Sequence, residues 1–127
     1  MIFGIGTDIV QIERVDRVLT RFGDRFAERL LMPQEIALYA GQRQKVRFLA
    51  MRFAAKEAVV KAMGTGFAHG MWIRDVGVVQ NEWGKPDIIY SARGQAMCEK
   101  LGIGEGHVSL SDEAGLVVAT AVLLKKA

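Results

Sequence analysis

Cysteine and histidine are scarce in this 127-residue chain, which has one cysteine and two histidines. A single cysteine cannot form an internal disulfide, and without a cluster of cysteine or histidine there are no ligands for a zinc site. Cys98 is expected to be a small packed side chain, and His69 a solvated loop residue. Long apolar runs are also missing: none approaches the roughly 18 residues of a membrane span, and no basic segment precedes a signal-like core. We expect a cytoplasmic protein that does not contact membranes.

Proline and linker-like sequence are equally rare. Two prolines and 14 glycines punctuate the chain without a low-complexity stretch or an internal repeat. A chain of this length suits one domain, and we expect that domain to cover residues 1–127. Half of the residues are hydrophobic, and the mean hydropathy is +0.16. Because this is apolar for a small soluble monomer, a partner subunit is expected to cover part of the surface.

Turn and cap signals divide the chain into predicted helices and strands. Gly23 and Gly64 suit helix ends, Pro33 suits a helix start, and Ser91 is a suitable N-cap. Helices are predicted over 13–22, 25–31, 34–40, 45–63 and 92–101. Strands are predicted over 1–12, 72–74, 76–80, 87–90, 107–111 and 116–124, with a four-residue turn at 112–115. Since helices and strands cluster instead of alternating, the expected fold class is α+β, a mainly antiparallel sheet packed against the long central helix.

The long central helix has charged residues among mostly apolar ones. From 48 to 63 the apolar positions encircle the helix axis, which is typical of a buried helix. Arg52, Lys56, Glu57 and Lys61 lie within this stretch, and an unpaired buried charge costs several kcal/mol. Glu57 and Lys61 are four apart and share one face, as do Arg52 and Lys56. The alternative interpretation is that Glu57 and Lys61 form an ordinary i,i+4 ion pair at the surface, with the long lysine side chains reaching to water.

A carboxylate also interrupts the first predicted strand. Asp8 lies in the middle of a run rich in isoleucine and valine, which is typical of a buried strand. Two carboxylates from different buried elements, Asp8 and Glu57, indicate a site for a hard cation. Mg²⁺ is held in proteins by one or two carboxylates together with water and substrate phosphates, and lysine or arginine neutralises those phosphates.

Five segments follow one another in order along the chain: GIGTDIV at 4–10, RFAAKEA at 52–58, KAMGTG at 61–66, GKP at 84–86 and HVSLS at 107–111. Together they resemble the bacterial holo-[acyl-carrier-protein] synthases, which are 4′-phosphopantetheinyl transferases. The resemblance implies the fold of that family and an Mg²⁺-dependent enzyme. Its expected reaction transfers the 4′-phosphopantetheine arm of coenzyme A to a serine of apo acyl carrier protein. The products would be holo acyl carrier protein, which serves fatty acid biosynthesis, and adenosine 3′,5′-bisphosphate.

The resemblance also implies roles for residues of the central helix. Asp8 and Glu57 would bind Mg²⁺, and Lys61 would contact the phosphates as a point charge. These three residues are the expected catalytic group. Arg52 would bind the 3′-phosphate of the nucleotide, for which its fork of donors is suited. The base that takes the serine proton stays open, since a water held by a carboxylate is one of several groups that could serve.

Three further segments would contact coenzyme A. By resemblance, Gly64, Thr65 and Gly66 form the loop beside the coenzyme, and Pro86 belongs to the turn that approaches the adenine. His107 would contact the coenzyme from a neighbouring subunit, which implies a homotrimer. Taken without the resemblance, the Gly-Thr-Gly string is an ordinary turn and not a P-loop, because a P-loop precedes its helix. A lone histidine at a strand start is likewise more often structural or surface-exposed.

Arginines recur along the first predicted helices, at positions 14, 17, 21, 25 and 29. Acidic residues are interleaved with them, so a solvated helix face is the ordinary interpretation. The resemblance instead implies that Arg14, Arg21 and Arg25 dock an acidic helix of acyl carrier protein.

Two other functions remain as alternatives. A net charge of +3 permits nucleic-acid binding, but no known nucleic-acid module is visible and aromatic residues do not alternate with the arginines. A divalent-metal phosphohydrolase would use the same two carboxylates with water as the nucleophile. The prediction is therefore a transferase acting on coenzyme A and acyl carrier protein, without a nucleic-acid partner.

Overall fold

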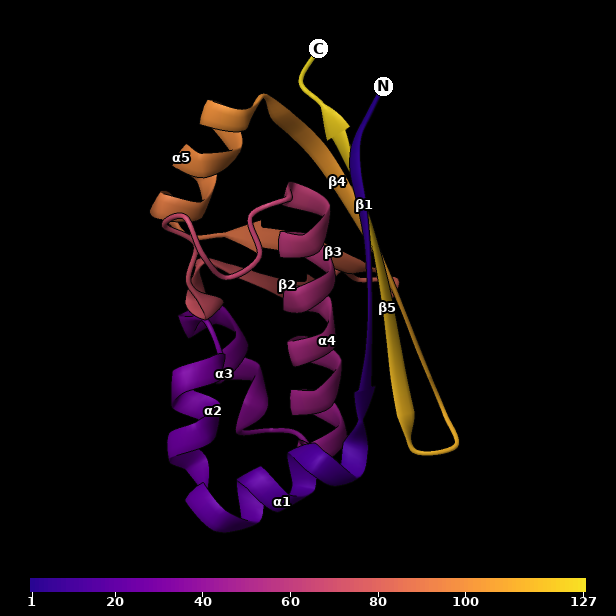
Figure 1. The fold of residues 1–127 in the computed structure, drawn as a ribbon. Coiled ribbons are helices and arrows are strands. Elements are labelled where there is room, and N and C mark those ends of the chain that lie inside the picture. The colour runs from indigo at the N-terminus through magenta and orange to yellow at the C-terminus, as the bar shows by residue number, and fades with distance from the viewer.

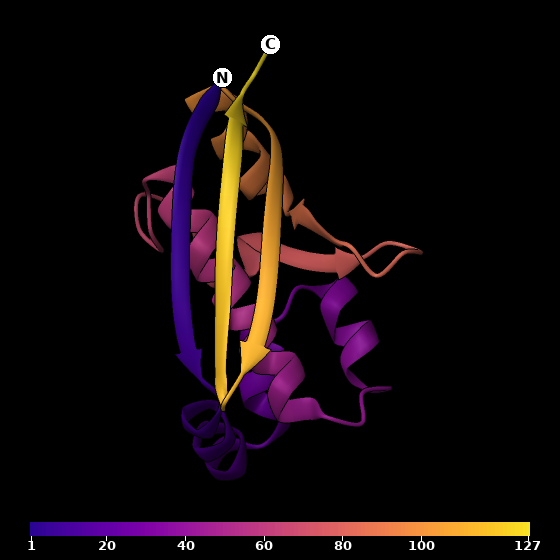
Figure 2. The ribbon, with the colours of Figure 1, turned by 90° about the vertical axis from the view of Figure 1, so that its right-hand side faces the viewer.

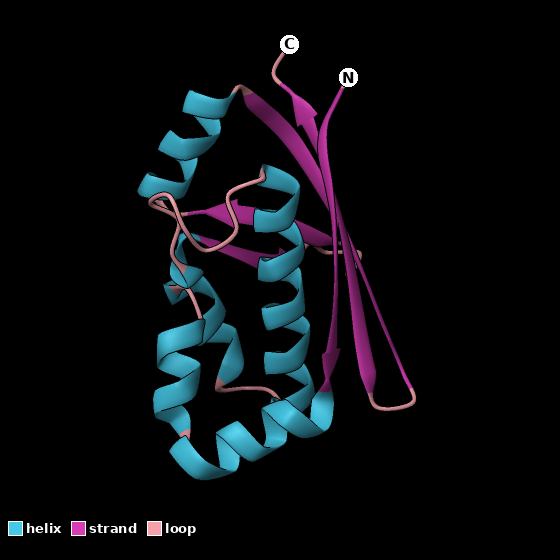
Figure 3. Ribbon diagram, in the orientation of Figure 1, coloured by secondary structure: helices cyan, strands magenta, loops and turns pink.

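A three-stranded antiparallel sheet lies along the long helix α4 in the computed structural model, which describes residues 1–127 (Figure 1). Helices and strands segregate into separate parts of the molecule, as Figure 3 shows. In chain order the elements are β1 (Ile2–Gln11), α1 (Ile12–Phe22), α2 (Asp24–Leu30), α3 (Pro33–Tyr39), α4 (Lys45–Met63), the 3₁₀ helix η1 (Ile73–Asp75), β2 (Val76–Gln80), β3 (Pro86–Tyr90), α5 (Ala92–Leu101), β4 (Ile103–Glu113) and β5 (Leu116–Lys125). The predicted α+β class with a central helix is confirmed.

The main sheet has the strand order β1-β5-β4, with the C-terminal strand in the middle (Figure 2). Its register places Asp8 opposite Ala119, and Ile5 opposite Val122, which in turn is opposite His107. Because successive side chains of a strand point to opposite faces, Asp8 faces α4 while Ile5 and His107 face outward. The β2–β3 hairpin forms a second small sheet that crosses near the middle of α4 (Figure 1).

Glycine allows β1 to lie with its backbone directly against α4. A β-carbon on Gly4 would be 2.0 Å from the carbonyl oxygen of Ala62, and one on Gly6 would be 2.0 Å from that of Ala58. The contacting residues of α4, Ala58 and Ala62, also have small side chains, which allows the close approach. The helix ends at Gly64, which adopts the left-handed conformation (φ 83°) that closes helix C-termini.

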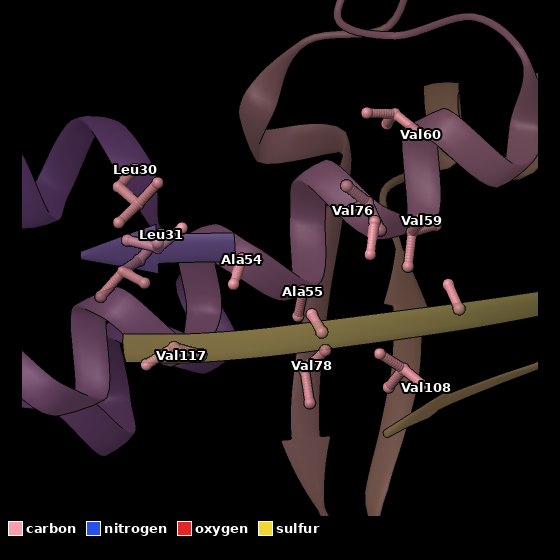
Figure 4. Packing of buried hydrophobic residues seen from close by; sticks show 14 of the residues in the cluster. Leu30, Leu31, Ala54, Ala55, Val59, Val60, Val76, Val78, Val108 and Val117 are labelled. Atoms are coloured by element: carbon pink, nitrogen blue, oxygen red, sulfur yellow. The ribbon is translucent and has the colours of Figure 1, made fainter. Parts of the chain in front are cut away.

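The hydrophobic core surrounds most of the circumference of α4, and only a few of its residues, such as Arg47 and Lys61, are exposed. Leu49, Val59 and Val60 are completely buried, and they meet Val76 from β2 and Val117 from β5. Figure 4 shows the labelled side chains of Val59, Val76 and Val117 gathered between the helix, the hairpin and the main sheet. A helix enclosed in this way must be apolar around most of its circumference, which explains the sequence pattern and leaves its buried charged residues in need of partners.

Three local predictions were wrong. The first strand was expected to be buried, but β1 is an edge strand whose Ile5 and Ile9 are exposed on the outer face of the sheet. The strand expected over 72–74 is instead the 3₁₀ turn η1, because the Asp75 carboxylate accepts a hydrogen bond from the amide of Trp72 at 2.8 Å and holds a tight turn. The four-residue turn expected at 112–115 is shorter, since β4 continues to Glu113. Ala114 and Gly115 form the turn alone, both with positive φ, as two-residue hairpins favour. None of the helices is both long and apolar enough to cross a bilayer.

Candidate active site

Asp8 and Lys61 meet where the middle of β1 crosses the last turn of α4. The Nζ of Lys61 donates hydrogen bonds to Asp8 Oδ1 at 3.0 Å and to the carbonyl oxygen of Thr7 at 3.1 Å. The Asp8 side chain is 15% exposed and that of Lys61 is 48% exposed. The carboxylate is thus set into the surface, whereas the ammonium reaches solvent and can also contact an incoming ligand.

Glu57 lies one helical turn before Lys61 and lines the same cavity as Asp8. This cavity has a volume of about 370 Å³, and its wall includes Val10, Arg14 and Phe53. Burial raises the pKa of Glu57, the charge of Asp8 raises it further, and Lys61 opposes both effects. The two carboxylates therefore repel each other in a partly buried setting, which favours a bound cation.

The donor set at this cavity fits Mg²⁺. No group of three or more histidine, cysteine, aspartate or glutamate side chains that could enclose a metal exists in the chain. Mg²⁺ does not need one, because it usually keeps several waters and binds one or two carboxylates plus phosphate oxygens. The position of both carboxylates in the wall of one cavity is the observation that supports this fit.

A larger cavity of about 810 Å³ opens at the N-terminal part of α4. Arg43, Arg47 and Arg52 line it, together with Phe48, Gln80 at the end of β2 and Asn81 of the β2–β3 loop. Arg47 forms two hydrogen bonds with Asp112, at 2.5 and 3.0 Å, and thereby ties α4 to β4. Arg43 and Arg52 have no such bidentate partner, so the cavity presents positive charge that suits a polyanion.

Arg52 lies deep in the wall of this cavity. It is 6% exposed, and its guanidinium carbon is 4.0 Å from the centre of the Phe48 ring, a cation–π arrangement. Its Nε is buried without a hydrogen-bond partner. The nearest carboxylate, Glu35, has its Oε2 3.9 Å from Arg52 Nε, which is too far for a hydrogen bond.

Lys56 does not face either cavity. Its side chain is completely buried, and its Nζ is 2.8 Å from Glu35 Oε1. Burial lowers the pKa of Lys56, whereas Glu35 opposes that effect. The prediction that the charged residues of α4 need partners is confirmed here, but the partner, Glu35, was not foreseen. Its only signal in the sequence is its position three residues after Met32, where a glutamate can cap a helix.

The arginine surface of α1 and α2 adjoins the Asp8–Glu57 cavity. Arg14 lines that cavity, and Arg25 lines a neighbouring one of about 330 Å³ together with the half-exposed Phe22. Val18 and Phe26 belong to both walls, so the two hollows are contiguous. A partner seated here would meet an apolar floor with cationic edges.

Comparison with known proteins assigns the family. A model of the 4′-phosphopantetheinyl transferase superfamily matches residues 4–121. The chain belongs to this superfamily. It is 47% identical over 122 residues to the holo-[acyl-carrier-protein] synthase of Photobacterium profundum, covering 96% of this chain and 97% of that protein. These matches confirm the resemblance seen in the five sequence segments.

Solved structures of the same family share the fold. The holo-[acyl-carrier-protein] synthase of Neisseria meningitidis superposes with a TM-score of 0.94 at 41% identity, covering 98% of this chain and 100% of that one. The enzyme of Helicobacter pylori, solved in complex with coenzyme A, superposes with a TM-score of 0.82 at 32% identity, covering 94% of this chain and 98% of that one.

The structure separates the remaining predicted residues of this transferase from its two main cavities. Gly64, Thr65 and Gly66 form the loop after α4, where the Thr65 hydroxyl donates to the carbonyl oxygen of Gly66 at 2.9 Å, and none of the three lines either cavity. Pro86 begins β3 beyond the loop whose Asn81 lines the larger cavity.

His107 lies on the outer face of the main sheet, opposite to the face that carries Asp8. Its side chain is 45% exposed, and its Nε2 is 3.6 Å from Glu105 Oε1. Within one chain the histidine therefore cannot turn toward the carboxylate site. A role at such a site requires another subunit.

Proposed function

We propose that residues 1–127 form one domain whose reaction centre is the Asp8–Glu57–Lys61 cluster. The enzyme transfers the 4′-phosphopantetheine arm of coenzyme A to a serine of apo acyl carrier protein and releases adenosine 3′,5′-bisphosphate. The observation that carries the site assignment is the convergence of two repelling carboxylates and a lysine beside the arginine surface of α1.

Asp8 and Glu57 would hold Mg²⁺ at their shared cavity. When bound, the cation polarises the phosphoryl oxygen and stabilises the charge of the departing bisphosphate. Lys61 keeps its ammonium beside Asp8 and neutralises phosphate charge from the exposed side. Phe53 and Val10 form an apolar part of the cavity wall beside these groups.

The nucleotide end of coenzyme A would occupy the larger arginine-lined cavity. Arg52, stacked on Phe48 and buried without a hydrogen-bond partner on Nε, is suited to bind the 3′-phosphate. Gly64, Thr65 and Gly66 would form the loop beside the coenzyme, and Pro86 would belong to the turn that approaches the adenine, as the family resemblance implies.

Acyl carrier protein would dock on the arginine surface. Arg14, Arg21 and Arg25 lie on α1 and α2, and the contiguous hollows between them accept the apolar side of an acidic helix. Since Arg14 also lines the Asp8–Glu57 cavity, a carrier seated there brings its serine next to the phosphate that is transferred.

A homotrimer would complete the site. The outer face of the main sheet exposes Ile5 (61%), Ile9 (62%) and Val118 (36%), an apolar surface that a subunit interface would cover. His107 lies on this same face, so an interface there could carry it to the coenzyme of a neighbouring subunit. We further propose that the reaction takes place in the cytoplasm, as expected from the sequence.

Mass spectrometry of apo acyl carrier protein tests the proposal. After incubation with coenzyme A, Mg²⁺ and this enzyme, the carrier serine should gain one phosphopantetheine arm. Asp8→Asn and Glu57→Gln should each abolish the gain while their circular dichroism spectra stay like that of the wild type. Release of phosphate or nucleotide without carrier modification would support a phosphohydrolase instead. Tight binding to a nucleic-acid duplex, without either reaction, would support a nucleic-acid-binding protein.

A further inference from the structure

Lys56 is bound from three sides by acceptors of the protein interior. Its Nζ donates to Glu35 Oε1 at 2.8 Å, to the carbonyl oxygen of Ile73 at 3.1 Å and to that of Val76 at 2.5 Å. Three acceptors require three N–H donors, which only the protonated ammonium has. Lys56 therefore carries its charge inside the core, and it has no donor left for a substrate.

Glu35 is held as tightly as Lys56. Its Oε1 also accepts from the amide of Met32 at 2.9 Å, and its Oε2 accepts from the amide of Val78 at 3.0 Å. The absence of a side chain on Gly77 makes this approach possible, because a β-carbon there would lie 2.8 Å from the Glu35 carboxyl. The carboxylate is thereby fixed on the side of Lys56 and of the β2 backbone.

Arg52 is left outside this close ion pair. Its Nε is 3.9 Å from Glu35 Oε2 and has no hydrogen-bond partner, although the residue is only 6% exposed. Two cations thus share one carboxylate, and the cluster carries one excess positive charge. Such a charge is costly away from water unless an anion compensates it. The arginine-lined cavity is where that anion can enter, because Arg52 forms part of its wall.

We propose that Lys56 is a positioning residue for coenzyme A binding. By occupying Glu35, it prevents Arg52 from closing onto that carboxylate and keeps the guanidinium stacked on Phe48, free for a phosphate of the substrate. This inference rests on the proposed placement of the nucleotide 3′-phosphate in the arginine-lined cavity. A lysine that never touches the substrate would then determine how tightly its phosphate is bound.

Nucleotide binding by Lys56→Met measures this effect. Methionine keeps an unbranched side chain but removes the charge, so Glu35 should pair with Arg52 instead. Calorimetry should show adenosine 3′,5′-bisphosphate binding weakened by roughly tenfold to a hundredfold, the range of a charge-assisted hydrogen bond, whereas adenosine 5′-monophosphate should bind nearly as before. The preference for the 3′-phosphate is the quantity to compare, because a general loss of stability would not change it selectively.

A second variant separates positioning from simple structural support. Lys56→Met/Glu35→Gln removes the competing carboxylate as well, so Arg52 is released again and the preference for the 3′-phosphate should return toward the wild-type value. Val59→Ala, a buried change on the same helix, is the matched control for destabilisation and should keep the wild-type preference. If Lys56→Met is too unstable to isolate, Lys56→Gln supplies the same comparison, since its amide still donates to a backbone carbonyl.

The outcomes are distinct. Equal preference in the wild type, the Lys56 variant and the double variant would overturn the positioning role of Lys56. A wild-type enzyme that transfers the arm to carrier protein but shows no preference for the 3′-phosphate would instead overturn the proposed placement of the nucleotide. Loss of preference in Lys56→Met and its recovery in the double variant would establish the inference.

Discussion

The contact between β1 and α4 leads to a prediction for Gly6→Ala. The added β-carbon would lie 2.0 Å from the carbonyl oxygen of Ala58 and 2.7 Å from the amide nitrogen of Ala62. Ordinary van der Waals contact begins at 3.4 Å, so the strand and the helix must separate by about 1.4 Å, the difference between 3.4 and 2.0 Å. Both atoms belong to the backbone of a buried helix and cannot rotate aside.

This separation displaces Asp8, which is two residues further along β1 and points to the same face. Misplacement of a reacting group by about 1 Å can cost on the order of 10²-fold in rate, so we expect kcat to fall by roughly 100-fold. Overpacking a core typically costs about 1–3 kcal/mol, and rigid backbone neighbours favour the upper end. A loss of about 3 kcal/mol lowers the Tm of a chain of this size by roughly 10 °C.

Transfer kinetics at saturating coenzyme A and Mg²⁺, followed by mass spectrometry of the carrier, measure the rate, and thermal melting by circular dichroism measures the stability. Gly104→Ala is the matched control. Its β-carbon would meet the Cα of Lys126 at 3.1 Å, and the end of the chain can shift by the few tenths of an ångström required. Wild-type kcat and Tm in Gly6→Ala would refute the direct backbone contact between β1 and α4.

Three further predictions concern the docking surface, the outer sheet face and acid stability. Replacing both Arg14 and Arg25 by glutamate should raise the KM for carrier protein at least tenfold with little change in the KM for coenzyme A. The same double variant should make transfer less dependent on salt concentration. If both KM values stay like those of the wild type at two salt concentrations, these arginines only solvate the helices. If the proposed homotrimer forms through the outer sheet face, Ile9→Arg should make the protein monomeric. An Ile9→Arg variant that still sediments as a trimer would contradict an interface on this face. Burial alone would raise the pKa of Asp75, but hydrogen bonds, led by that from Ser91, lower it overall. The carboxylate of Asp75 therefore stabilises the fold above its unfolded pKa of about 3.9, and this stabilisation is lost as pH falls through the folded pKa. Asp75→Asn should reduce the free energy of unfolding at pH 7 much more than at about pH 2. Urea titrations of the wild type and the variant at both pH values measure this difference.

The local patterns of the sequence predicted most of the elements. The all-round apolar character of α4 placed that helix in the core correctly, because a helical repeat is a property of neighbouring residues. The prediction of a buried first strand was wrong, because β1 lies at the edge of the main sheet and exposes Ile5 and Ile9 on its outer face. The 3₁₀ turn at 73–75 was missed, since it depends on the carboxylate of Asp75 and not on the β-rich composition around it. The roles of Asp8, Glu57 and Lys61 stay predictions, although the structure does bring the three together.

By itself the sequence determined the family, the fold class and the need of the charged residues of α4 for partners, because motifs and hydrophobic periodicity depend only on residues that are neighbours along the chain. Only the tertiary structure decided which charge pairs with which. Lys56 pairs with Glu35 across 21 positions, and Arg47 pairs with Asp112 across 65. It also decided that His107 faces away from Asp8, since that follows from the register of β4 on β5 and β1. Such contacts depend on distances between remote segments, which no local pattern records.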